Sequence, residues 1–298
     1  MCFKLTRQIL PLSMILLLFG ACGQYSNTSE NQLVSFNFPY NLQEPDIIYE
    51  LPPVLDEISA LSISNNNEVI CLQDEDAVIF IYDLEANMIT NRFLFGKSND
   101  FEGVEVVDET IYVLESNGRI NEINNLGQEN QEVIVHKNFL SSKNNAEGLG
   151  YDAETNSLLI ACKGKAGDGK RMEEKKAIYR FDLRTKTLEV EPIILFRKED
   201  LYNYIEANNL NELSFKLKKK MPFNPSGIAV KDGFYYTIAS IGNMLIVTDK
   251  VGNIRYVSPI GKGFLPKPEG IAFDKDNRLI IASEAKNGNG RIAVFSQR

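Results

Sequence analysis

A carboxylate recurs at one place in a repeated phrase of this chain. The phrase reads FEGVEVV from Phe101, AEGLGYD from Ala146 and PEGIAFD from Pro268, with looser copies DEISALSIS and PSGIAVK. Aligning the copies on the acidic position gives one set of residues: Glu57, Glu102, Glu147, Ser226 and Glu269. Equivalent positions of a repeat gather around one centre, and four carboxylates gathered there repel each other unless something neutralises them. The sequence therefore predicts a charged site built from the repeat.

A second polar set ends the apolar segment that follows each phrase, and its members are Asp74, Glu115, Lys163, Ser240 and Glu284. Calcium takes six to eight oxygen ligands in flexible geometry, so it would neutralise such a cluster. The predicted calcium ligands are Glu57, Glu102, Glu147, Glu269, Asp74 and Glu115. Two alternatives stay open: Lys163 could supply the positive charge, or each glutamate could accept backbone N–H groups and bind no ion.

Other chemistry finds little support in the sequence. The only histidine, His136, lies in QEVIVHKN and is predicted to be an ordinary residue of an outer edge strand, which speaks against a serine–histidine triad or a histidine-bound zinc site. Cys71 and Cys162 lie inside apolar runs and are predicted to be buried free thiols. The segment GKAGDGKR has P-loop spacing, but Arg171 stands where the magnesium-binding Ser or Thr belongs, so we interpret it as a hairpin loop.

The spacing of the phrases predicts the fold that positions these residues. The aligned positions are separated by 45, 45, 79 and 43 residues, and each phrase is followed by two or three further short strand-like segments. Four short strands every forty-odd residues is the period of a β-propeller blade. The apolar runs are nearly continuous, as expected for sheets that are covered on both faces. We predict an all-β, five-bladed β-propeller.

Two departures from the period predict how the ring is completed. The long step is explained by a helical insertion at residues 197–221, between blades 3 and 4, in which Leu201, Ile205, Leu213 and Leu217 recur at helical intervals. The last unit has only three strands, so residues 45–52 are expected to supply the closing strand by pairing with RIAVFSQR. Closure removes exposed sheet edges. The propeller domain is predicted to span residues 45–298.

The N-terminal residues predict export. Lys4 and Arg7 precede an uncharged apolar run and the sequence LFGAC, so residues 1–21 are interpreted as a signal peptide and Cys22 as the lipidated first residue of the mature protein. Residues 22–44 are predicted to be a tether. The expected location is the cell envelope, with the lipid anchored in a bacterial membrane, most simply the outer membrane facing the periplasm. Loss of two basic residues changes the net charge from -8 to -10, and with no basic stripe nucleic acid is not an expected partner.

The ordered series DEISALS, FEGVEVV, NAEGLGYD, PSGIAV and PEGIAFD resembles the SdiA-regulated family, whose bacterial propellers are distantly similar to NHL-repeat proteins. The resemblance covers the chain from about Leu51 to its end. It implies a five-bladed propeller and a calcium site, and it leaves the biochemical activity open.

Three functions are compatible with these residues. The leading hypothesis is an envelope lipoprotein whose calcium-binding channel mouth, together with the insertion, binds a small ligand or an envelope protein. The rival is a calcium-dependent hydrolase, similar to lactonases of the propeller class, with Glu102 or Glu147 as the base. The third is a structural lipoprotein without a small ligand. Whether the protein is an enzyme stays open at this point.

Overall fold

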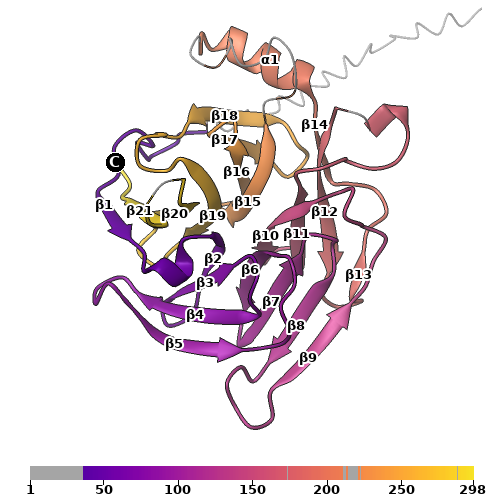
Figure 1. Cartoon of the computed structure of the whole chain (residues 1–298). Coiled ribbons are helices and arrows are strands. Elements are labelled where there is room, and N and C mark those ends of the chain that lie inside the picture. The colour runs from indigo at the N-terminus through magenta and orange to yellow at the C-terminus, as the bar shows by residue number, and fades with distance from the viewer. Residues whose placement is uncertain (1–35, 173, 211–212, 214–220, 222, 287) are drawn as a thin grey trace, which may run out of the picture. The chain divides into compact units, whose positions relative to one another are not determined.

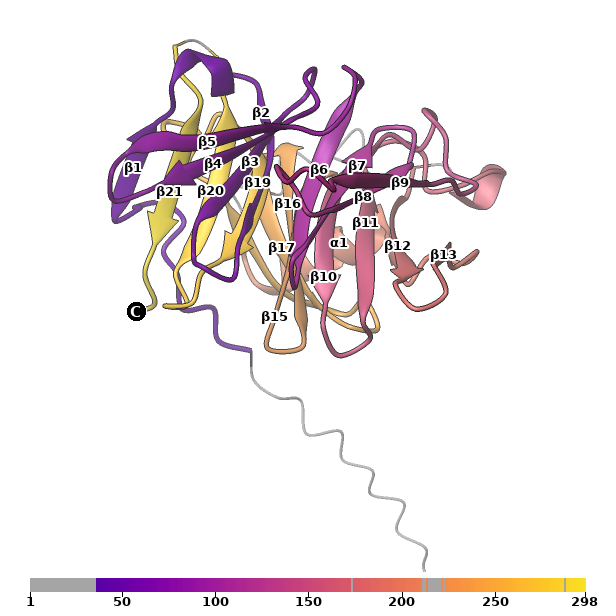
Figure 2. The same ribbon diagram turned by 90° about the horizontal axis from the view of Figure 1, so that it is seen from below.

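Five antiparallel sheets stand around a common centre in the computed structural model (Figure 1), which describes residues 36–298 except 173, 211–212, 214–220, 222 and 287. Seen from the side, inner strands such as β10 and β15 run between the two faces of the ring, whereas the outer strands β5 and β9 lie across that direction (Figure 2). The all-β, five-bladed β-propeller predicted from the repeat is confirmed. The predicted signal peptide, Cys22 and the tether as far as residue 35 lie outside the described residues.

The strands follow one order in every blade. The innermost strands are β2 (Ile58–Ile63), β6 (Phe101–Val107), β10 (Ala146–Asp152), β15 (Asn224–Lys231) and β19 (Lys267–Phe273). The second strands are β3 (Val69–Gln73), β7 (Thr110–Glu115), β11 (Ser157–Cys162), β16 (Phe234–Ile241) and β20 (Leu279–Glu284). The third strands are β4 (Val78–Asp83), β8 (Ile120–Asn124), β12 (Lys176–Asp182), β17 (Met244–Asp249) and β21 (Arg291–Phe295).

The outer strands differ more between blades. Three blades have one regular outer strand, namely β5 (Met88–Leu94), β9 (Glu132–His136) and β18 (Ile254–Pro259). The third blade has two short ones, β13 (Thr187–Leu188) and β14 (Ile194–Phe196), which pair with different parts of β12. The outer strand of this blade is therefore interrupted. Short 3-10 helices lie at η1 (Pro53–Leu55) and η2 (Lys170–Met172).

The last blade is completed by the N-terminal strand β1 (Ile47–Glu50). It pairs antiparallel with β21, from Ile47 opposite Val294 to Glu50 opposite Arg291. Two further backbone hydrogen bonds extend the pairing, because Asp46 N donates to Val294 O at 2.9 Å and Leu51 N to Gly290 O at 2.8 Å. The pairing partner is the one expected from the sequence, and it gives β21 a neighbour on its outer side.

The core lies between neighbouring blades, which explains the continuous apolar runs. Every residue of β3 and β11 is buried, whereas most of β5 is exposed. The buried hydrophobic residues form separate clusters, each shared by two adjacent sheets. Cys71 and Cys162 belong to these clusters as buried free thiols, as predicted.

The insertion contains helix α1 (Lys198–Ala207), between β14 of the third blade and β15 of the fourth. Leu201, Ile205 and Leu213 are buried in the cluster between these two blades, and Tyr204 Oη donates to Arg255 O at 2.9 Å. Figure 1 places α1 beside β18 at the periphery of the ring. The apolar side of α1 therefore packs between blades, and the expected part of the insertion in ligand binding stays a prediction. Residues 211–212 and 214–220 of the insertion lie outside the described residues.

The domain begins earlier than predicted. The compact unit starts at Phe36, and within residues 36–44 the side chains of Tyr40 and Leu42 are buried against the last two blades. Phe38 stacks on Tyr256 with ring centroids 4.4 Å apart. Residues 36–44 therefore belong to the propeller and not to the tether. The aromatic residues of FNFPYNL carried this signal, but the polar residues between them obscured it.

His136 lies on the edge strand β9 as expected, but it is half-buried and its Nε2 lies 2.8 Å from Glu122 Oε2, so it is not an ordinary surface residue.

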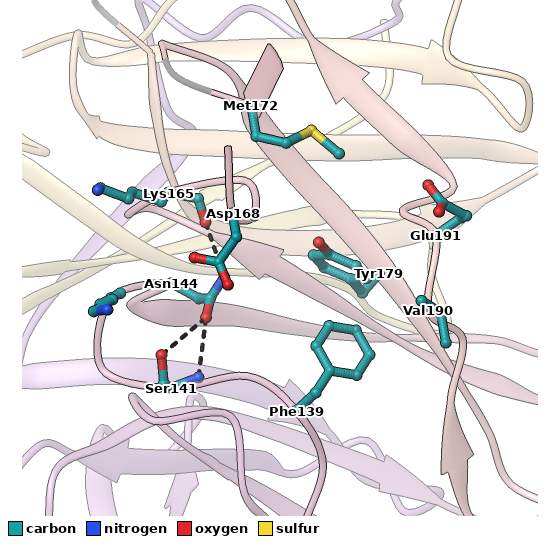
Figure 3. Close-up of a pocket in the computed structure, with 11 residues that line it drawn as sticks. Phe139, Ser141, Asn144, Lys165, Asp168, Met172, Tyr179, Val190 and Glu191 are labelled. Carbon is teal, nitrogen blue, oxygen red and sulfur yellow. Dashed lines mark hydrogen bonds between the residues drawn. The ribbon is translucent and has the colours of Figure 1, made fainter. Parts of the chain in front are cut away.

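A cavity of about 230 Å³ lies beside the third blade (Figure 3). Among the described residues, no helix is both long and apolar enough to cross a membrane.

Removing residues 1–44 should destabilise the propeller more than removing residues 1–35. Both truncated proteins keep β1, but only the shorter deletion keeps the buried Tyr40 and Leu42. Losing one buried leucine or aromatic side chain costs about 2–5 kcal/mol, so we expect a difference of at least about 3 kcal/mol in the free energy of unfolding. Urea unfolding of the two proteins measures it. Equal midpoints and slopes would show that residues 36–44 contribute nothing to the fold.

Candidate functional site: the channel mouth

A one-residue irregularity near the start of each inner strand brings the repeated position to the channel. The pairing with the second strand skips a residue between Ile58 and Ala60, and at the equivalent place in the other four blades. The skipped residues are Ser59, Glu102, Glu147, Ser226 and Glu269. A β-bulge leaves its extra residue unpaired and re-aims the side chain.

The first blade therefore contributes Ser59 and not Glu57, and the sequence alignment was wrong there by two residues. Glu57 precedes β2, is exposed, and corresponds in register to Asp100 before β6. The alignment followed the acidic residue type instead of the strand register. A signal was present, because Gly103 follows Glu102 directly whereas Ile58 follows Glu57.

In the second polar set, Glu115 is not at the position that the other members share. Glu115 pairs with Phe101, so its equivalent in the first blade is Gln73, and the equivalent of Asp74 is Ser116. Adjacent residues of a strand point to opposite faces. The Glu115 carboxylate accepts hydrogen bonds from Asn117 Nδ2 at 2.9 Å and Asn121 Nδ2 at 3.1 Å within its own blade. It is consequently not part of the ring that contains Asp74, Ser116, Lys163, Ser240 and Glu284.

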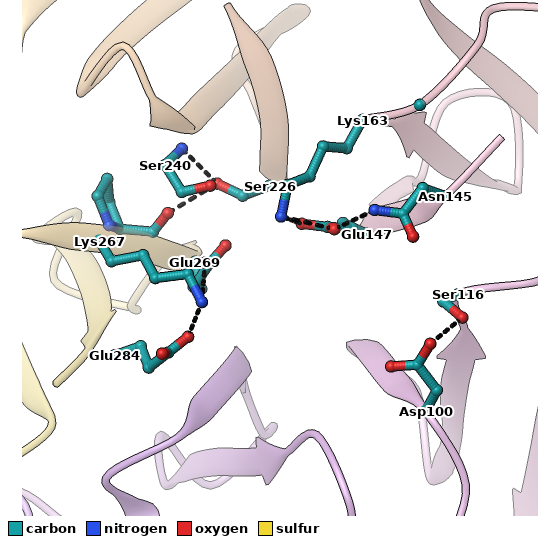
Figure 4. Close-up of polar contacts among 12 residues, drawn as sticks. Asp100, Ser116, Asn145, Glu147, Lys163, Ser226, Ser240, Lys267, Glu269 and Glu284 are labelled. Atoms are coloured by element: carbon teal, nitrogen blue, oxygen red, sulfur yellow. Dashed lines mark hydrogen bonds and ion pairs between the residues drawn. The ribbon is translucent and has the colours of Figure 1, made fainter. Parts of the chain in front are cut away.

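The predicted site residues thus separate into those that converge and those that do not. Glu102, Glu147, Glu269 and Asp74 belong to the channel mouth, Glu57 lies at its exposed rim, and Glu115 points away. The sequence analysis missed Asp100, Ser116 and Lys267, which Figure 4 shows beside the same central space. Asp100 and Lys267 stand two residues before the aligned glutamates, and this position could have been noticed as a third ring.

Lysines neutralise part of the site. Lys163 Nζ lies 2.8 Å from the carboxylate of Glu147, which also accepts a hydrogen bond from Asn145 Nδ2 at 2.6 Å. Lys267 Nζ lies 3.4 Å from Glu269 Oε1 and also contacts the carboxylate of Glu284 (Figure 4). The alternative in which Lys163 supplies positive charge is therefore present in the structure, and Lys267 adds a second cation.

Glu102 is different from the other two bulge glutamates. Among the described residues, none forms an ion pair or a hydrogen bond with its carboxyl group. Burial, followed by the charges of Glu147 and Asp100, raises the pKa of Glu102 to about 9. Burial, followed by the charge of Glu147, likewise raises the pKa of Glu269 to about 8. Burial and the neighbouring carboxylates therefore favour the protonated form of Glu102.

Two further oxygen atoms in the mouth lack partners. Asp74 Oδ1 and Ser240 Oγ are buried and form no hydrogen bond with any described residue. Burial and the neighbouring Glu57 raise the pKa of Asp74. Such orphaned polar atoms are uncommon in native proteins and call for an explanation such as a bound water or ion.

Ser226 shows what a bulge residue does when it is purely structural. Its hydroxyl donates to Pro268 O at 2.7 Å and accepts from Ser240 N at 3.1 Å, so it ties the fourth blade to the fifth. This is the capping alternative considered from the sequence, and it holds at Ser226. Glu102 makes no comparable bond to the described part of the chain, so the same explanation does not extend to it.

The donor chemistry fits a hard cation, although the mouth is not a ready-made chelate. The donors in the mouth are carboxyl and hydroxyl oxygens, the ligand type that calcium prefers. In the described part of the chain, however, no three Asp, Glu, His or Cys side chains stand close enough together to hold one ion. The cavity between the inner strands measures about 10 Å³, roughly the space of one water molecule. A cation would have to draw Glu147 or Glu269 away from its lysine.

The fold and the channel define this protein as a five-bladed β-propeller, and solved structures show what it is similar to. The glutaminyl cyclase of Myxococcus xanthus has 11% identity and a TM-score of 0.55, over 85% of this chain and 94% of that one. A luciferin-regenerating enzyme has 10% identity and a TM-score of 0.50, over 85% and 95%. A streptogramin B lyase has 14% identity and a TM-score of 0.45, over 84% and 68%. At such identities the likeness shows the fold alone. No family model and no curated protein sequence matches the chain.

Stability in the presence of a chelator should fall as the pH rises from about 5 to 9. The pKa of Glu102 is raised from 4.5 to about 9 in the folded protein, so between these values the folded state holds a proton that the unfolded state has released. Stability decreases with pH wherever the folded state binds more protons. Glu102→Gln removes this contribution, so the variant should be more stable than the parent at pH 8 by roughly 1–4 kcal/mol, with a shallower pH slope.

The measurement is the free energy of unfolding in urea at several pH values. Glu109→Gln is the matched control, because it removes the same charge from an exposed turn between β6 and β7, and it should keep the parent's slope. A Glu102→Gln protein that follows the parent curve throughout would show that Glu102 is ionised in the folded state.

Proposed function

We propose that the protein is a binding module of the bacterial envelope whose channel mouth takes up a calcium ion. The observation that supports this most is Glu102, a partly buried carboxyl group that has no partner among the described residues and lines the same small cavity as the buried Glu147 and Glu269. Asp74 Oδ1 and Ser240 Oγ add two unsatisfied oxygens nearby. The resemblance of the repeated phrases to the SdiA-regulated family supports the same assignment, and we propose membership of that family.

Proton exchange is central to the proposed binding. Glu102 would lose its proton to become a ligand. The Glu147 carboxylate would exchange part of its contact with Lys163 for contact with the ion, and the Glu269 carboxylate would exchange part of its contact with Lys267. A positive ion lowers the pKa of the carboxyls around it, so calcium affinity should increase with pH and binding should release protons. Water and backbone carbonyls complete the shell of such an ion.

The proposed setting is a membrane surface, with the lipid on Cys22 as the anchor. Residues 22–35 would connect the anchor to the propeller, which begins at Phe36. The calcium-loaded mouth would then bind a small ligand or an envelope protein carrying an anionic or carbonyl oxygen, since such an oxygen can complete the coordination of the ion.

Calcium should stabilise the parent protein and not the Glu102→Gln variant. At a hundred times the dissociation constant, a ligand that binds only the folded state adds about 2.7 kcal/mol. The melting temperature should therefore rise with calcium and fall on chelation. In Glu102→Gln the calcium increment should be abolished, although the metal-free variant is folded and at least as stable. Titration calorimetry in two buffers of different ionisation enthalpy should show proton release by the parent alone.

Glu115→Gln is the matched control, because Glu115 belongs to the same blade but points away from the mouth, and it should keep the full calcium increment. Magnesium at equal concentration controls for general screening of the acidic rim. A parent protein whose melting temperature ignores calcium would remove the metal from the proposal. Calcium-dependent opening of a lactone that disappears in Glu102→Gln would instead make the mouth catalytic.

Replacing Cys22 by Ser should release the protein from membranes or stop its processing. The thioether to the lipid needs the cysteine sulfur, and a single hydroxyl cannot replace it. Membrane fractionation and labelling with a fatty-acid analogue measure the effect. Cys71→Ser is the control, because it replaces a buried thiol and leaves the anchor cysteine unchanged. Unchanged lipid labelling of the Cys22→Ser protein would contradict the anchor.

A further inference from the structure

The cavity beside the third blade is separate from the channel mouth and has a composition of its own. It lies between the connection before β10, the loop between β11 and β12, and the connection from β13 to β14. Its volume of about 230 Å³ is below the range typical of drug-sized ligands, so it suits a small molecule. Neither the repeat nor the proposed calcium site explains this cavity.

One side of the cavity is an aromatic corner. The rings of Phe139 and Tyr179 have centroids 5.5 Å apart and planes inclined at 74°, and Met172 and Val190 extend the apolar lining (Figure 3). The phenol of Tyr179 is fixed because its Oη donates to Ala166 O at 2.5 Å, and burial raises its pKa to about 12. Phe139 and Val190 are 51% and 75% exposed, which is unusual for large apolar side chains and leaves them free to contact a ligand.

Four charged side chains surround this corner: Lys143, Lys165, Asp168 and Glu191. None of them forms an ion pair with another described residue, although most other charged groups near the blade do. Figure 3 shows Glu191 on the side of Val190 and Tyr179, whereas the ammonium group of Lys165 extends to the opposite side. The lining therefore carries both signs of charge with no net charge, and the charges of Glu191 and Lys165 lie on opposite sides of the cavity, with Asp168 between them.

We propose that this cavity binds a small zwitterion with an alkylated ammonium group at one end and a carboxylate at the other. Aromatic faces attract ammonium groups whose charge is spread over methyl groups, and the nearby carboxylates of Asp168 and Glu191 add to this attraction. Lys143 and Lys165 supply the opposite charge for the carboxylate end. Asn144 holds the loop in place, because its Nδ2 donates to Lys165 O at 3.0 Å and its Oδ1 accepts from Ser141 N at 3.0 Å.

Three matched probes test the proposal on the folded protein by titration calorimetry. Glycine betaine has both charges, 3,3-dimethylbutanoate has the same shape without the positive charge, and choline lacks the carboxylate. We expect glycine betaine to bind about tenfold more tightly than either of the others, because one cation–π or ion contact is lost in each. Excess chelator is present throughout, so the result does not depend on the proposed calcium site.

Variants assign the two ends of the cavity. Phe139→Leu and Glu191→Gln should weaken glycine betaine and choline by several-fold and leave 3,3-dimethylbutanoate unchanged, whereas Lys165→Met should weaken the two carboxylates and leave choline unchanged. Glu129→Gln, an exposed carboxylate between β8 and β9, is the control that should change nothing. Equal binding of glycine betaine and 3,3-dimethylbutanoate, or no heat of binding with glycine betaine at millimolar concentration, would overturn the proposal.

Discussion

The structure depends on how closely the five inner strands approach one another around the axis. A Cβ atom on Gly227 would lie 2.6 Å from Glu269 O, and one on Gly270 would lie 2.7 Å from Leu61 N, so neither position can carry a side chain without a shift of backbone. In four of the five blades glycine therefore follows the bulge residue, because the next blade occupies the space of its side chain. The same crowding accompanies the bulge that directs the preceding residue into the channel. Fold and site thus come from one constraint.

That constraint creates an electrostatic problem. Glu147 and Glu269 are 2% and 5% exposed, so their charges are largely removed from water. Lys163 and Lys267 compensate part of this negative charge by direct contact with the two carboxylates, and protonation of Glu102 lowers the negative charge further. A proton is a neutraliser that a cation can replace, whereas the structural hydrogen bonds of Ser226 leave nothing to exchange. The channel mouth therefore contains carboxyl groups whose charge depends on pH, which is what the proposed calcium binding requires.

The sequence predicted the five-bladed ring correctly but only part of the site, and this difference has a physical reason. Blade number, the closing strand and the place of the insertion follow from the spacing of apolar runs, and one misplaced residue leaves such a pattern intact. Site membership depends on single-residue register, because a shift of one residue turns a side chain to the opposite face. Glu115 was misassigned by one residue in this way. Glu57 was misassigned by two residues, because the alignment followed the acidic residue type instead of the strand register. The N-terminal boundary of the domain was predicted too late, because the aromatic residues of the segment 36–44 pack on blades that are distant in sequence.

Two acidic residues of one strand show how burial alone does not identify a site. Glu105 lies on β6 only three residues after Glu102 and lines a cavity at the other end of the inner strands, and burial raises its pKa to about 7. Its carboxylate accepts hydrogen bonds from Ser62 Oγ at 2.6 Å and Val106 N at 3.0 Å, so it links the first two blades. Hydrogen bonds to the charged form lower a carboxyl pKa, and they offset part of the desolvation at Glu105. Glu102 has no such bonds to any residue that the structure describes. Its unsatisfied bonding capacity, more than its acidity or depth, is therefore what makes it the better candidate for a ligand, because Glu105 is already used by the fold.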